Sequence, residues 1–322
     1  MHYIRIKVLY QQDMFSRRNL RVKVMLALYA MEMNQCEDVA TGLKMLQSFI
    51  AKAYKLRLFN LGLLVRLADL IRKERAIKES KFLPTEKDRQ FSARLAANPY
   101  IESLRKDKNL NAQILKLTQT EEEQALVKDL LKSILGKKEY RHYCALENTS
   151  PEDERAIVLY IFEKLLPNLR AYREYVEDNY PECLNELARI NYSVSQVFES
   201  VPHQGMPAEQ PSDNAEIVFA RELLTYTLQQ EERLRNIIQP RLKNWDADRI
   251  ARIDMILMKM AVCELISFNE IPVKVSINEY IDLAKIYSTP RSKDFINGIL
   301  DNVMRDLYAR NEIVKTGRGL IE

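Results

Sequence analysis

Near the C-terminus, the apolar positions predict two helices joined by a short loop. The first runs from about Lys274 to Lys285, where Ser276 is placed to act as N-cap and Glu279, three residues on, completes a capping box. The sequence Ser-Thr-Pro at 288–290 ends this helix, and Ser292 is placed to cap the next. Gly298 lies inside the second helix. Because a mid-helix glycine costs about 1 kcal/mol relative to alanine, we expect it to permit a close helix contact.

Near the N-terminus, apolar residues are spaced for one face of a helix that Ser16 is placed to cap. These residues are Leu20, Val24, Ala27 and Met31. Further helices are predicted from Thr41 to Arg75, from Glu121 to Leu135, and from Pro151 to about Leu166. We expect five tyrosines between these segments to pack at helix interfaces, with stacking on nucleic-acid bases as the alternative. They are Tyr140, Tyr143, Tyr172, Tyr175 and Tyr180.

Composition supports an all-α fold and the breaks in the pattern suggest its domains. The 322 residues include only 7 Gly, against a usual share of roughly 7%. We divide the chain into an extension at 1–13, a basic helix at 14–31, a helical insertion or N-terminal subdomain at 32–199, a proline-containing linker at 200–214, a helical C-terminal subdomain at 215–310, and a flexible tail at 311–322. A second methionine, Met14, precedes the basic helix, so translation starts at Met1 or at Met14.

Positive charge is local rather than general. The formal net charge is +4, and from residue 215 onward basic and acidic residues balance at 16 each. The predicted N-terminal helix, in contrast, opens with Arg17, Arg18 and Arg21. Guanidinium groups bind phosphate oxygens bidentately, so this cluster suits a nucleic acid. A solvated charged face is the alternative.

No pattern for catalysis, metal or cofactor binding is evident. The four cysteines and three histidines are scattered without metal-ligand spacing, and there is no glycine-rich phosphate loop or G-x-S-x-G motif. No apolar run approaches the ~20 residues that a membrane-spanning helix needs. We therefore expect a cytoplasmic, non-enzymatic binding protein with reduced thiols, no cofactor and no membrane association.

Both ends of the chain carry the motifs of a known family. Four blocks occur in order, at 242–254 (LKNWDADRIARID), 261–265 (AVCEL), 271–279 (IPVKVSINE) and 295–301 (FINGILD). Together with the basic start at 16–21 (SRRNLR), they resemble the NusB family of transcription antitermination factors. The resemblance implies an all-helical fold of two small bundles. The middle of the chain then corresponds to the long helical insertion of an extended variant, in which residues 82–88 (FLPTEKD) are similar to a segment of such variants.

The resemblance implies RNA binding without catalysis. Members bind the boxA element of ribosomal RNA transcripts together with NusE, a small-subunit ribosomal protein, in an antitermination complex on RNA polymerase. Carried over by position, the expected RNA contacts are Arg17, Arg18, Arg21, Tyr29 and Phe295, and we expect Arg291 and Lys293 of the loop before Phe295 to add to them. Glu264 corresponds to a partner-facing glutamate. Compact members have glycine and acidic residues where this chain has a basic loop at 288–293, which leaves the exact RNA sequence preference open.

Two other functions stay open at this stage. One is a helical protein-interaction adaptor without RNA binding. The other is the accessory domain of a ribosomal RNA methyltransferase, which would require a Rossmann-like segment in the middle of the chain. Both monomers and homodimers occur among NusB-like proteins.

Overall fold

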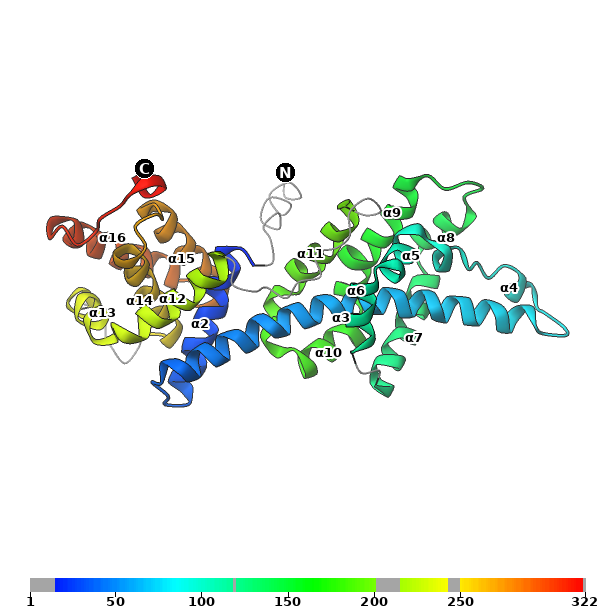
Figure 1. Cartoon of the computed structure of the whole chain (residues 1–322), viewed down its shortest axis with the longest axis horizontal. Helices are drawn as coiled ribbons and strands as arrows, with labels where there is room; N and C mark the ends of the chain where they lie inside the picture. The colour runs from blue at the N-terminus through cyan, green and yellow to red at the C-terminus, as the bar shows by residue number, and fades with distance from the viewer. Residues whose placement is uncertain (1–14, 118–119, 201–214, 243–249, 321–322) are drawn as a thin grey trace. The chain divides into compact units, whose positions relative to one another are not determined.

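The computed structural model describes residues 15–117, 120–200, 215–242 and 250–320, and every regular element in these ranges is helical (Figure 1). This confirms the all-α prediction. The expectations for residues 1–14 and for linker residues 201–214 lie outside the described residues. None of the described helices is both long enough and apolar enough to span a membrane.

The chain forms two compact units. Among the described residues, unit 1 comprises residues 51–117 and 120–200, and unit 2 comprises residues 15–50, 215–242 and 250–320. Helix α3 (Val39–Glu79) contributes its first turns to unit 2 and the remainder to unit 1. The predicted amphipathic stretch from Thr41 to Arg75 is confirmed within it.

Unit 2 is built from helices at the two ends of the chain. Its helices besides the start of α3 are α2 (Arg17–Met33), α12 (Ala215–Gln229), α13 (Glu231–Ile238), α14 (Arg252–Ser267), α15 (Val273–Tyr287) and α16 (Ser292–Ala309), with 3₁₀ turns at Gln239–Leu242 and Gly317–Leu320. Helix α2 packs against α12 and α14, and α14 packs against α12, α13, α15 and α16. Helices from the two ends of the sequence thereby share one hydrophobic core.

Burial in unit 2 is greatest on α14 and α2. Every residue of α14 from Ile256 to Leu265 is buried, as its continuous apolar character predicts. The predicted stripe on α2 (Leu20, Val24, Ala27 and Met31) is confirmed, but the burial extends further. All seven residues from Asn19 to Met25 are buried, so this part of the helix has no solvated face.

Several local expectations for unit 2 are wrong. Ser276 lies inside α15, whose N-cap position is Pro272, and its hydroxyl donates to Glu264 across the core. Ser292 is the first residue of α16 and its hydroxyl donates to Asp254. A Cβ at Gly298 would meet nothing within 4 Å, so this glycine does not mark a close helix contact.

Part of the tail beyond α16 contacts the rest of unit 2. Ile313 is buried, the Lys315 ammonium donates to the carbonyl of Phe268, and the Thr316 N–H donates to the carbonyl of Asn269. These contacts attach residues 313–316 to the end of α14.

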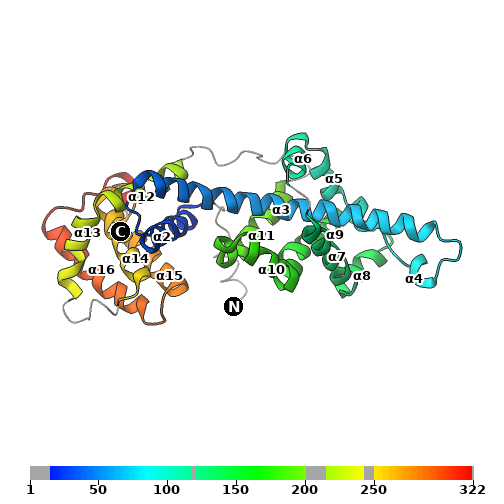
Figure 2. The ribbon, with the colours of Figure 1, turned by 90° about the horizontal axis from the view of Figure 1, so that it is seen from below.

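Unit 1 surrounds the C-terminal part of α3 with short helices. They are α4 (Glu86–Arg89), α5 (Pro99–Lys106), α6 (Lys108–Leu115), α7 (Glu121–Leu135), α8 (Lys138–Ala145), α9 (Pro151–Tyr160), α10 (Arg170–Asn179) and α11 (Leu187–Ser200), with a π-helical turn at Ile161–Leu165 and 3₁₀ turns at Arg94–Ala97, Leu166–Asn168 and Pro181–Glu186. Figure 2 shows α5 and α6 on one side of α3, and α7, α8, α10 and α11 on the other. The predicted bounds of α7 and the predicted start of α9 at Pro151 are confirmed, and Ser150 caps α9.

Aromatic residues and amides form the core of unit 1. The rings of Phe59 and Tyr175 stack with centroids 4.7 Å apart. The side chains of Asn60, Tyr172 and Asn191 are joined by hydrogen bonds of 2.8–3.2 Å. All five tyrosines singled out in the sequence are buried, which confirms that they pack at helix interfaces.

Candidate nucleic-acid interface

The first two arginines of α2 lie at the surface of unit 2, each beside an acidic residue. The Nε of Arg17 donates to Glu216 of α12 at 2.9 Å, with its side chain 38% exposed. The Nη2 of Arg18 donates to Asp282 of α15 at 3.0 Å, and its Nη1 lies 3.6 Å from Glu279. The Arg17 guanidinium is therefore within reach of solvent, whereas the Arg18 side chain is only 15% exposed, and at either residue an incoming phosphate would compete with carboxylates.

Arg21, in contrast, points into the core. Its side chain is 3% exposed, and its Nε and Nη2 donate to the two carboxylate oxygens of Glu264 at 2.8 and 2.7 Å. The guanidinium also lies over the rings of Phe219 and Tyr280, 5.2 and 5.8 Å from their centroids. The expectation that Arg21 contacts RNA directly is therefore corrected: its charge is used inside unit 2.

Glu264 is completely buried and accepts four hydrogen bonds. Besides the two from Arg21, Ser276 Oγ donates at 2.6 Å and the Tyr280 hydroxyl donates at 2.9 Å. Burial alone would raise the pKa of Glu264, but the Arg21 guanidinium and these hydrogen bonds hold the pKa below its ordinary value. The expectation that Glu264 faces a partner is corrected in the same way, because its carboxylate has no exposed surface.

The loop between α15 and α16 is held in place by a single carboxylate. Asp254, in the first turn of α14, is 5% exposed and accepts hydrogen bonds from Ser288 Oγ at 2.5 Å and Ser292 Oγ at 2.7 Å. Thr289 Oγ1 lies 2.8 Å from Ser292 Oγ and extends this arrangement. The backbone of residues 288–292 is thus fixed against α14.

This loop presents two cations. Arg291 is exposed and Lys293 is half-buried, and among the described residues neither forms an ion pair. Phe295 follows one turn later and packs partly against the core. Arg18 contacts α15 at Glu279 and Asp282, six or more residues before the loop, whereas the loop itself is held at Asp254 near the start of α14.

Tyr29 is 36% exposed but lies apart from the arginines. It is twelve residues beyond Arg17 on the same helix, a separation of about 18 Å along the axis at 1.5 Å per residue. The structure therefore places Arg18 against the middle of α15 and leaves Tyr29 at the other end of α2, where Lys259 of α14 donates to Glu32.

The acidic partners and the role of Asp254 did not emerge from the sequence. Glu279 and Asp282 are three residues apart on α15 and so share a helix face, which was the available signal for a site facing Arg18. Asp254 carries no such signal, because its partners are 34 and 38 residues away.

Comparison with known proteins agrees with this geometry. A sequence model of the NusB family matches residues 185–305. The transcription antitermination protein NusB of Bacillus pumilus is 36% identical over 126 residues, which are 39% of this chain and 92% of that protein. The chain belongs to the NusB family.

Two further NusB relatives match over a smaller part of their length. The transcription antitermination protein NusB of Salinibacter ruber is 48% identical over 103 residues, and that of Chloroherpeton thalassium is 36% identical over 104 residues. This chain covers 64% and 49% of their respective lengths. No solved structure matches the chain.

Proposed function

We propose that this NusB-family protein is a transcription antitermination factor whose unit 2 binds the boxA element of ribosomal RNA transcripts together with NusE, within a complex on RNA polymerase. The similarity to transcription antitermination proteins and the position of the cations in unit 2 support the proposal. It involves binding and no catalysis.

The observation that carries the proposal is the clamped basic loop. Asp254 fixes the loop backbone, so Arg291 and Lys293 stand at defined positions without carboxylate partners among the described residues. A cation that is not already paired gains most from an RNA phosphate, and a fixed backbone lowers the entropy lost on binding. Arg17 and Arg18 extend this surface, and their paired acids make their contribution smaller.

Aromatic contacts complete the proposed RNA surface. Phe295 follows the loop by two residues and is partly exposed, and we propose that the exposed part of its ring contacts a base. Tyr29, at the other end of α2, serves a longer RNA that follows the helix. The residues proposed to contact RNA are Arg17, Arg18, Tyr29, Arg291, Lys293 and Phe295.

The accessory-domain hypothesis is not favoured. A methyltransferase segment is built on a parallel sheet, whereas the described part of unit 1 is made of helices. The adaptor hypothesis differs from the proposal only in RNA binding, and a titration separates them.

The test uses two matched double variants on α16. Arg291→Gln with Lys293→Gln removes the loop cations, and Arg305→Gln with Arg310→Gln removes two exposed cations, 70% and 59% exposed, at the far end of the same helix. With a fluorescent boxA RNA, log affinity falls as log salt rises. For the loop variant this slope should become shallower by about 1.4, which is about 0.7 for each of the two lost phosphate contacts. The control should keep the wild-type slope. Equal slopes for all three proteins would refute the assignment of this loop.

A further inference from the structure

The far end of α3 in unit 1 displays two apolar side chains to solvent. We define the tip as residues 72–91, which comprise the end of α3, a turn and α4. Phe82 is 97% exposed and Leu83 is 82% exposed. Such exposure of an aromatic and an aliphatic side chain side by side is unfavourable in water, which suggests that something covers them.

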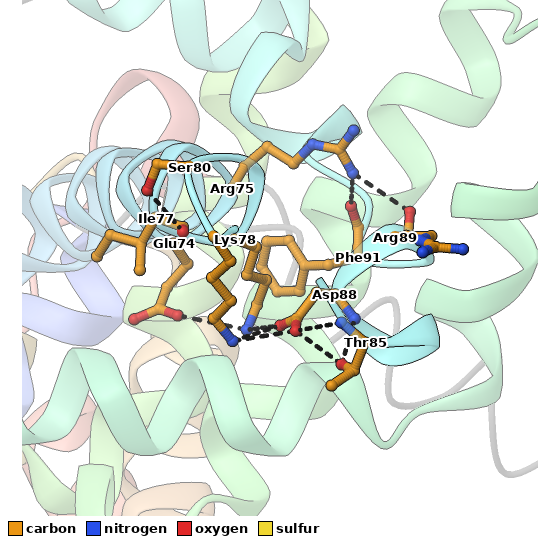
Figure 3. A network of polar contacts seen from close by, with 10 residues as sticks. Glu74, Arg75, Ile77, Lys78, Ser80, Thr85, Asp88, Arg89 and Phe91 are labelled. Atoms are coloured by element: carbon orange, nitrogen blue, oxygen red, sulfur yellow. Dashed lines mark hydrogen bonds and ion pairs between the residues drawn. The ribbon is translucent and has the colours of Figure 1, made fainter. Parts of the chain in front are cut away.

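The tip backbone is held in one conformation. Thr85 and Asp88 form a capping box at the start of α4 (Figure 3). The Lys81 ammonium donates to both carboxylate oxygens of Asp88 at 2.9 and 3.0 Å. Arg75 of α3 donates to the carbonyl of Phe91 at 2.6 Å. The exposure of Phe82 is therefore built into an ordered turn and does not come from a loose loop.

The tip is also positively charged at its surface. Residues 72–90 include seven basic and four acidic residues. One of the acids, Asp88, is only 5% exposed and is used inside the turn. Lys87 and Arg89 are exposed and lie within seven residues of Phe82.

We propose that the tip is a second RNA-binding surface, separate from unit 2, on which Phe82 stacks against a base while Lys87 and Arg89 contact phosphates. Base stacking accepts any base, and the neighbouring cations supply attraction to the backbone. Leu83 packs against the same base or its ribose. This inference does not depend on boxA recognition by unit 2.

RNA fits the tip better than an apolar protein pocket does. Three side chains of this kind (Ile77, Phe82 and Leu83) cover at most about 500 Å² even when fully buried, below the ~800 Å² per partner of a stable protein interface. One or two stacked bases need no more than that area. The net positive charge of the tip then adds to RNA affinity, because each phosphate contact releases counterions.

The test measures binding of a labelled, unstructured 12-nucleotide uridine-rich RNA to the full chain. All proteins carry Arg291→Gln and Lys293→Gln, so that the tip dominates the signal. Phe82→Ala should weaken binding roughly 5- to 150-fold, the loss expected for one stacked base. Phe82→Trp should retain binding, because indole also stacks. Leu115→Ala, a change at a 68% exposed apolar residue of α6, is the control and should have no effect.

A charge variant and a crosslink complete the test. Lys87→Gln with Arg89→Gln should lower the salt slope by about 1.4, whereas Lys132→Gln, at a 78% exposed lysine of α7, should leave it unchanged. Crosslinks from 4-thiouridine in the RNA should map to the peptide that contains Phe82. The proposal is overturned if Phe82→Ala binds like the parent, or if crosslinks occur only in unit 2. The effect of the loop variant on boxA binding tests the proposed function of unit 2. It does not test RNA binding by the tip.

Discussion

Removal of Arg21 should destabilise unit 2 far more than removal of the neighbouring Arg17. Arg21→Ala leaves Glu264, which has no exposed surface, without its guanidinium partner and without two hydrogen bonds. Breaking a buried ion pair from one side costs about 3–5 kcal/mol. The pair of Arg17 with Glu216 is about 40% exposed on both sides, so Arg17→Ala should cost less than about 1 kcal/mol.

The loss of stability caused by Arg21→Ala should also depend on pH. In the wild type the pKa of Glu264 is lowered, so this group stabilises the fold above its unfolded pKa and loses that effect as pH falls through the folded pKa. In the variant, burial without Arg21 raises the folded pKa, so Glu264 opposes folding as pH rises through that pKa. The difference in free energy of unfolding between the wild type and Arg21→Ala should therefore be largest near pH 7 and become smaller towards pH 4.

Urea unfolding followed by far-ultraviolet circular dichroism measures these differences, with Arg17→Ala as the matched control. Hydrogen exchange on α14 peptides locates the loss in unit 2. A deficit below about 1 kcal/mol for Arg21→Ala, or one that stays constant between pH 7 and pH 4, would refute the reasoning. The same argument means that replacing Arg17, Arg18 and Arg21 together does not leave the fold intact.

Three further changes test local features. Asp254→Ala should speed amide exchange in residues 288–292 and weaken boxA binding several-fold, because the loop loses two hydrogen bonds; unchanged exchange would contradict the clamp. Gln35→Gly should raise the free energy of unfolding by about 1 kcal/mol, since Gln35 has φ 51° at the end of α2, and a loss of stability in urea would count against it. Thr85→Ala should cost about 1 kcal/mol locally and speed exchange at the tip, where an unchanged rate would contradict the cap.

The helices could be predicted because their signals are local. Apolar spacing predicted the core stripe of α2 and the bounds of α7. The caps proposed at Ser276 and Ser292 failed for a reason that is not local. Each hydroxyl donates a hydrogen bond to a buried carboxylate on α14. It therefore does not cap the backbone N–H groups of its own helix.

The candidate site could be predicted only in part for the same reason. The basic character of α2 was visible, but its partners Glu216 and Glu264 lie 199 and 243 residues away in sequence. Arg21 directly follows the buried Leu20 in a segment of α2 whose residues are all buried. Its side chain therefore lies in the core. Burial of a charge depends on tertiary packing, which the spacing of one helix does not contain.

The most direct test of the proposed function is a titration of the wild-type chain with boxA RNA and with a scrambled RNA of the same composition, each with and without NusE. We predict tighter binding of boxA than of the scrambled RNA, a further gain in boxA affinity when NusE is present, and weaker binding as salt rises. Equal affinity for the two RNAs, with no effect of NusE and no dependence on salt, would contradict RNA recognition by this protein.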